Sequence, residues 1–113
     1  MDIVCRKFRP FARNTLLGFA EIEIKDIGLT VRDVALHQKG GSRWAQLPAK
    51  PQIKDGAVVS IDGKAQYVCI LEFGSREMRD EFSAAVVDAV LATNDGRTAL
   101  KSAQTNANAN IPF

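Results

Sequence analysis

Four basic residues in the middle of the chain have no acidic neighbour, a pattern suited to binding phosphate groups. No Asp or Glu occurs between residues 34 and 54, and the only tryptophan, Trp44, lies within this stretch. Cations that neutralise phosphates beside aromatic rings that stack on bases are typical of a single-stranded nucleic-acid surface. Two alternatives are a solvated basic loop and a tryptophan buried in the core. The four basic candidates are Lys39, Arg43, Lys50 and Lys54.

Further candidates lie on either side of this stretch. Three arginines near the start of the chain would extend the phosphate path if the first strand lies alongside, and Tyr67 is a candidate for base stacking. Strand alternation places Trp44 on the face opposite Arg43, so we expect this tryptophan to be mainly structural. Phe19 shares its face with two glutamates, which argues against that face as the binding surface. The three arginines are Arg6, Arg9 and Arg13.

Composition limits the classes of protein to be considered. The chain has 113 residues, a net charge of +2, two cysteines and one histidine, which fits a single soluble domain in a reducing, cytoplasmic compartment. His37 has no His or Cys at ligand spacing, and no serine has a nearby histidine, so we expect no metal, no cofactor, no catalytic residue and no enzymatic activity.

The pattern of apolar residues predicts an α+β fold with a curved antiparallel sheet of about five strands. Strands are expected over residues 2–9, 16–25, 29–39, 43–47 and 65–73, with Gly40-Gly41 at a hairpin turn. The alternation changes phase near Arg32-Asp33, which predicts a β-bulge. Segment 65–73 is apolar on both faces and is therefore expected to be covered on both sides.

One long helix is expected after the last strand. Ser75 is a good N-cap, the helix should run to about residue 93, and the sequence Asn94-Asp95-Gly96 should end it. One apolar stripe would pack on the sheet. A second stripe on the opposite side favours a homodimer, with a few exposed aliphatic residues as the alternative. That second stripe consists of Ala84, Val87 and Leu91.

The end of the chain differs in composition from the rest. We expect one domain over residues 1–96 and a flexible polar tail over residues 97–113, because the tail cannot bury enough apolar surface to fold alone. The tail ends in three residues typical of a tethered peptide ligand, which are Ile111, Pro112 and Phe113.

Three stretches resemble the stage V sporulation protein G (SpoVG) family. They are LTVRDVALHQKGGSRWAQLPAKP (29–51), YVCILEF (67–73) and MRDEFSAAVVDAVL (78–91). The resemblance spans roughly residues 16–92 and implies a small antiparallel sheet on one helix that dimerises and binds DNA or RNA as a regulator. The helix departs from this pattern because its net charge is negative. A negatively charged helix is a poor phosphate binder. The matching positions are Asp33, Gly40, Gly41, Trp44, Leu47, Pro48, Lys50, Asp88, Ala89 and Val90.

The final tripeptide resembles the tip of bacterial single-stranded-DNA-binding proteins (SSB), although asparagines replace the acidic residues of that tip. The resemblance implies recruitment of a DNA-processing partner in replication or repair. Together, these patterns predict a non-enzymatic protein that binds single-stranded DNA or RNA as a homodimer. No association with a membrane is expected. The alternatives are a protein-interaction dimer and a regulator that binds double-stranded nucleic acid.

Overall fold

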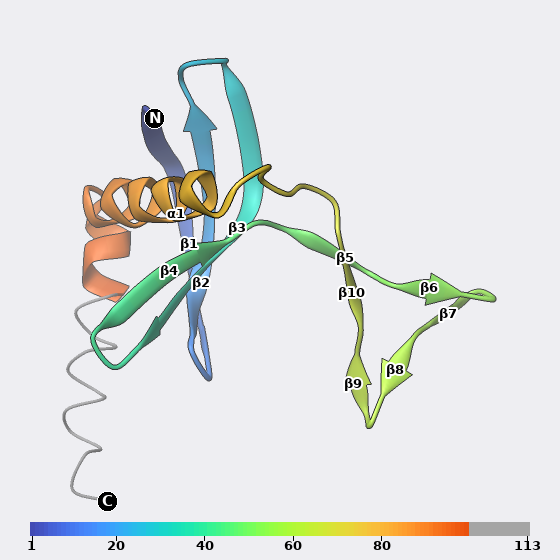
Figure 1. Ribbon diagram of the computed structural model, residues 1–113. Coiled ribbons are helices and arrows are strands. Elements are labelled where there is room, and N and C mark those ends of the chain that lie inside the picture. Colours follow the sequence, from blue (N-terminus) through green and yellow to red (C-terminus); the bar gives the residue numbers. More distant parts are fainter. Residues whose placement is uncertain (100–113) are drawn as a thin grey trace, which may run out of the picture.

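The computed structural model describes residues 1–99 and has an α+β fold (Figure 1). A four-stranded antiparallel sheet has the order β1-β2-β3-β4 and is built by successive hairpins. Its strands are β1 (Ile3–Arg13), β2 (Leu16–Ile24), β3 (Leu29–Lys39) and β4 (Ser42–Gln46). The predicted turn at Gly40 is confirmed, since this glycine has φ +59°, a backbone conformation that is easiest without a side chain.

The β-bulge predicted at Arg32-Asp33 is confirmed. Val31 pairs with Ile22 and Val34 pairs with Ala20, so two residues of β3 face one residue of β2. Asp33 takes up the extra length with φ 60°, in the left-handed region. The bulge keeps both valines on the buried face although their spacing along the chain is odd.

Helix α1 (Arg76–Leu91) covers one face of this sheet. Its buried residues Phe82, Val86 and Val90 recur every four positions and form one stripe. They pack with apolar residues from the facing strands, including Phe8, Ile22 and Leu36. Burying side chains of this size contributes about 1.5–3 kcal/mol each. The Ser75 hydroxyl accepts a hydrogen bond from the Met78 backbone N–H at 3.2 Å, so the predicted N-cap is confirmed.

The prediction of one long helix ending at Asn94-Asp95-Gly96 is wrong. Helix α1 has 16 residues, and a second helical segment begins at residue 94 and continues through residue 99. Thr93 separates the two, because its hydroxyl donates to the Val90 carbonyl at 2.7 Å and accepts the Gly96 N–H at 2.9 Å. A hydroxyl that satisfies a free N–H at the start of a helix is an N-cap. The expected domain boundary after residue 96 falls inside this segment, and residues 100–113 lie outside the described residues.

The predicted sheet of about five strands is also corrected, because the chain leaves the sheet after β4. Residues 48–73 form an arm that projects from the body (Figure 1). The segment expected to be a covered fifth strand lies in this arm, where Ala65 pairs with Ser60 and residues 67–69 pair with residues 49–51. The arm contains β5 (Ala49–Pro51), β6 (Ile53–Lys54), β7 (Ala57–Val58), β8 (Ser60–Ile61), β9 (Lys64–Ala65) and β10 (Tyr67–Cys69).

Candidate nucleic-acid interface

The sheet face opposite α1 carries two cross-strand rows of aromatic and basic residues. Strand register aligns Arg9, Phe19, Ala35 and Gln46 in one row, across all four strands. The next row aligns Leu16, His37 and Trp44. Because side chains alternate along a strand, these residues lie on the face away from the helix. We call this surface the open face.

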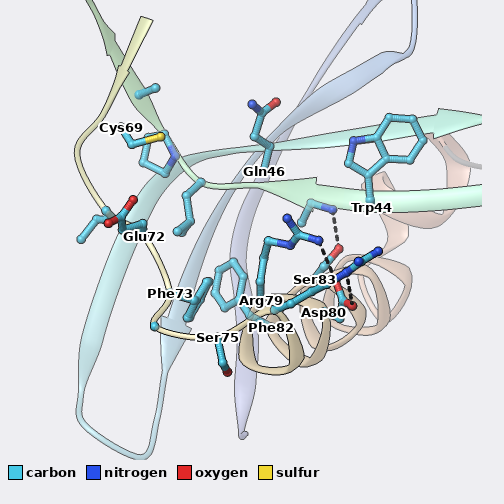
Figure 2. Close-up of a pocket in the computed structure, with 17 residues that line it drawn as sticks. Trp44, Gln46, Cys69, Glu72, Phe73, Ser75, Arg79, Asp80, Phe82 and Ser83 are labelled. Atoms are coloured by element: carbon cyan, nitrogen blue, oxygen red, sulfur yellow. Dashed lines mark hydrogen bonds and ion pairs between the residues drawn. The ribbon is translucent and has the colours of Figure 1, made fainter.

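His37 and Trp44 form a flat platform at one end of the open face. Their rings are stacked, with centroids 5.3 Å apart and planes inclined by 8°. The Thr15 hydroxyl lies 3.0 Å from His37 Nδ1 and orients the imidazole. Trp44 is only partly buried and is not a core residue. The alternative of a tryptophan buried in the core is therefore wrong. Figure 2 shows its ring on the side of β4 away from α1.

A second aromatic group lies across the neighbouring strands. The rings of Phe11 and Phe19 have centroids 6.2 Å apart, and the Arg9 guanidinium lies 5.3 Å from the centre of the Phe19 ring. Phe11 is 52% exposed. The open face therefore presents exposed aromatic surface from β1, β2 and β4, which is the arrangement that base stacking requires.

Each carboxylate of the open face is paired with an arginine. Glu23 pairs with Arg6, and the Glu21 carboxylate lies 3.1 Å from Arg32 Nε. Asp33 in the bulge lies 3.7 Å from Arg9. The sequence alone argues against this face because of its two glutamates. Their pairing greatly reduces the repulsion that they would exert on a phosphate.

The predicted basic residues fall into two groups. Arg6, Arg9 and Arg13 lie on β1, and Lys39 lies at the end of β3 near the Gly40 turn. A backbone hydrogen bond from Gln38 to Thr15 joins the two hairpins at this end of the sheet, at 2.9 Å. Within residues 1–99, neither Arg13 nor Lys39 makes an ion pair.

The other predicted residues lie away from the open face. Arg43 faces the opposite side of β4, and its Nε donates to Gln38 Oε1 at 2.8 Å. The three remaining candidates lie in the arm, where Tyr67 is 64% exposed. The sequence therefore identified a basic path that the fold divides between body and arm. The arm candidates are Lys50, Lys54 and Tyr67.

A groove of about 1100 Å³ lies where the arm joins the body. Its apolar walls include Leu47, Leu71 and Phe73, and the Phe73 ring lies 5.1 Å from that of Phe82 in the core (Figure 2). Arg79 and Asp80 line its helix side. The root of the arm is therefore hollow, with a lining that is partly apolar and partly polar. We call this surface the root groove.

The two groups with shifted pKa values lie at structural positions of the sheet. Burial raises the pKa of the Cys5 thiol. The thiol donates a hydrogen bond to the Lys7 carbonyl at 3.4 Å. The backbone N–H of Asp2 donates to Asp26 at 2.8 Å and lowers the pKa of that carboxyl. Across residues 1–99, no three His, Cys, Asp or Glu side chains lie close enough to hold a metal ion.

The predicted contacts for partners have different outcomes. Val87 and Leu91 pack partly against the core of their own chain, whereas Ala84 is exposed. The second helix stripe is therefore largely used within the chain. The candidate peptide Ile111, Pro112 and Phe113 lies outside the described residues. No helix in the described part of the chain has the length and apolar character needed to cross a membrane.

No protein-family model, curated protein or solved structure matches this chain.

Two aromatic residues of the open face, Phe11 and His37, were missed as binding candidates from the sequence. Phe11 lies beyond the predicted end of the first strand at residue 9, whereas β1 continues to Arg13. The sequence does not identify His37, because its stacking depends on the pairing of β3 with β4. The available signal was the two-residue turn at Gly40-Gly41. Counting outward from this turn places Trp44 opposite His37 on the neighbouring strand.

Proposed function

We propose that this protein binds single-stranded nucleic acid, DNA in preference to RNA, on the open face of its sheet. The observation that carries this proposal is the aromatic surface formed by the His37–Trp44 stack and the Phe11–Phe19 pair. Stacking of one base on an aromatic side chain contributes about 1–3 kcal/mol. Arg13 and Lys39, at the joined hairpin ends, would hold the phosphates. No enzymatic step is required for this function.

The resemblance to the SpoVG family supports a nucleic-acid ligand, and the tip of the tail supports a DNA-processing partner. A regulator that binds duplex DNA is the second candidate from the same resemblance. Sheet faces with exposed aromatic rings favour unpaired bases, because paired bases are stacked on one another and do not offer a free ring face. We therefore place single strands first. A homodimer and a cytoplasmic location belong to the same proposal.

Fluorescence anisotropy with labelled oligo-dT and a matched duplex tests the proposal. We expect tighter binding to oligo-dT, a steep loss of affinity with salt, and quenching of Trp44, the only tryptophan. Trp44→Ala should weaken binding about tenfold, which corresponds to the loss of one stacked base. Lys39→Ala should lower the salt slope by about one unit.

The matched control is Ile27→Ala, since Ile27 is 70% exposed and lies in the turn between β2 and β3. This change should leave the affinity unaltered. Absence of binding to either oligonucleotide at low salt would refute the proposal, and a preference for the duplex would favour the regulator. Deletion of residues 111–113 should leave oligo-dT binding intact while a tail-dependent partner is lost.

A further inference from the structure

The arm leaves most of its large apolar side chains uncovered. Among residues 1–99, twelve large hydrophobic side chains are exposed, and seven of them belong to the arm. Tyr67 is 64% exposed and Leu71 is 43% exposed. The other five are Ile53, Val58, Ile61, Val68 and Ile70. Contiguous exposed apolar surface on a small protein marks a site of interaction.

The secondary structure of the arm is too thin to cover these side chains by itself. β10 pairs with β5 over three residues, and the two hairpins beyond it pair over two residues each. The three pieces meet at Gln52, Val59 and Gln66, whose backbones exchange hydrogen bonds of 2.8–2.9 Å. This junction fixes the shape of the arm and adds no apolar layer. A two-stranded ribbon without such a layer is marginally stable in water.

We propose that the arm is covered by the arm of a second copy of this chain, paired antiparallel along the free edge of β10. In the sheet order β10-β5, one edge of β10 has no partner strand within the described residues. Two identical strands paired antiparallel are related by a two-fold axis, which gives a closed dimer. The product would be a four-stranded sheet in the order β5-β10-β10-β5, beyond the three strands that independent stability requires.

The same arrangement fills the root groove. Two arms that run antiparallel place the tip of each beside the root of the other. The tip carries the exposed side chains of Ile53 and Ile61, and the root groove offers the apolar walls of Leu47 and Phe73. One two-fold axis therefore covers both apolar surfaces, which a partner bound to only one of them would not do.

The exposed apolar area of the arms is comparable with the apolar area of a stable dimer interface. A fully exposed aliphatic side chain presents on the order of 100–150 Å². Seven side chains that are about half exposed give roughly 400–500 Å² in each copy, or about 800–1,000 Å² in two. A standard interface of about 1,200–2,000 Å² is 56–65% apolar and therefore contains an area of this size.

The mass of the protein in solution tests this arrangement without nucleic acid, so the result is independent of the proposed nucleic-acid binding. We expect the full-length chain to sediment at twice its mass of 12.3 kDa. Leu71→Asp should reduce this to the monomer mass, because it buries a charge in the root groove that the tip of the second arm fills. Leu71 is exposed in the monomer, so its replacement should leave the far-ultraviolet circular dichroism of the body unchanged.

Two control variants locate the interface. Ile27→Asp changes a more exposed apolar residue of the body, and Ala84→Asp changes the exposed position of the second helix stripe. Both should remain dimers. A monomeric wild-type protein at high micromolar concentration would overturn the proposal. So would a dimer that survives Leu71→Asp, or one that is lost with Ala84→Asp while Leu71→Asp leaves it intact.

Discussion

Strand β2 and the segment 65–73 are both rich in apolar residues, yet only one of them is buried. β2 lies between β1 and β3 with α1 across one face, and Ala20 and Ile22 are almost inaccessible. The segment 65–73 makes only short pairings with β5 and β8 in the arm, and Tyr67 and Ile70 remain more than half exposed. Apolar content thus indicates that a strand needs cover, whereas the topology decides whether its own chain supplies it.

The largest difference between body and arm should appear in the free energy of unfolding. Phe82 is 1% exposed, so Phe82→Ala should cost about 3–5 kcal/mol. Tyr67→Ala in the arm should change the value by no more than about 0.5 kcal/mol. Both are best measured by urea denaturation in the Leu71→Asp background, where a second copy does not cover the arm. Equal losses would show that the arm contributes to the core.

Two glycines give a smaller contrast of the same kind. A Cβ atom at Gly18 would lie 2.5 Å from the Arg9 carbonyl oxygen and 2.7 Å from the Phe8 ring. Gly18→Ala should therefore cost about 1–3 kcal/mol through displacement of β1. A Cβ atom at Gly74, at the base of the arm, meets nothing within 4 Å, so Gly74→Ala should be nearly neutral. The midpoint of thermal unfolding reports both, and an equally large drop for Gly74→Ala would contradict the contrast.

The reactivity of the two cysteines gives a further comparison of body and arm that does not depend on the free energy of unfolding. Cys5 lies partly buried in β1, whereas Cys69 lies exposed in β10. Burial raises the pKa of Cys5, so its reactive thiolate is scarcer at pH 8. In the Leu71→Asp background, iodoacetamide should alkylate Cys69 faster than Cys5, because Cys69 is exposed and Cys5 is partly buried. Peptide mass spectrometry measures both rates, and equal rates would contradict the burial of Cys5.

The same shift in the pKa of Cys5 has a defined sign for stability. The folded state binds the thiol proton more tightly than the unfolded state, because its pKa is raised. The contribution to folding is therefore complete below the ordinary pKa and is lost as the pH rises through the raised value. Cys5→Ala should remove this alkaline dependence, whereas Cys69→Ala should not alter it.

Local signals predicted the parts of the fold that depend on neighbouring residues. The hairpin at Gly40, the bulge at Asp33 and the N-cap at Ser75 each follow from residue type and alternation over a few positions. The Thr93 cap was missed, because Asn94-Asp95-Gly96 suits a turn as well as the first turn of a helix. The hydrogen bond from the Gly96 N–H to the Thr93 hydroxyl is what distinguishes the start of a helix from a turn here.

Long-range pairing accounts for what the sequence did not reveal about the site. The neutralisation of Glu21 by Arg32, and the stacking of His37 on Trp44, depend on the register between strands. The separation of Lys50 and Lys54 from the open face depends on the chain leaving the sheet after β4. A count of charges along the chain contains neither kind of information.

The bulge in β3 also has a consequence for chain length. If a relative of this protein lacked one residue at position 32 or 33, Val31 and Val34 would share a regular alternation and would still face the helix. Such a chain would lose the left-handed residue at Asp33 and, with it, the local bend and extra twist of the strand. Loss of a single residue here would thus leave the core unchanged and flatten the open face.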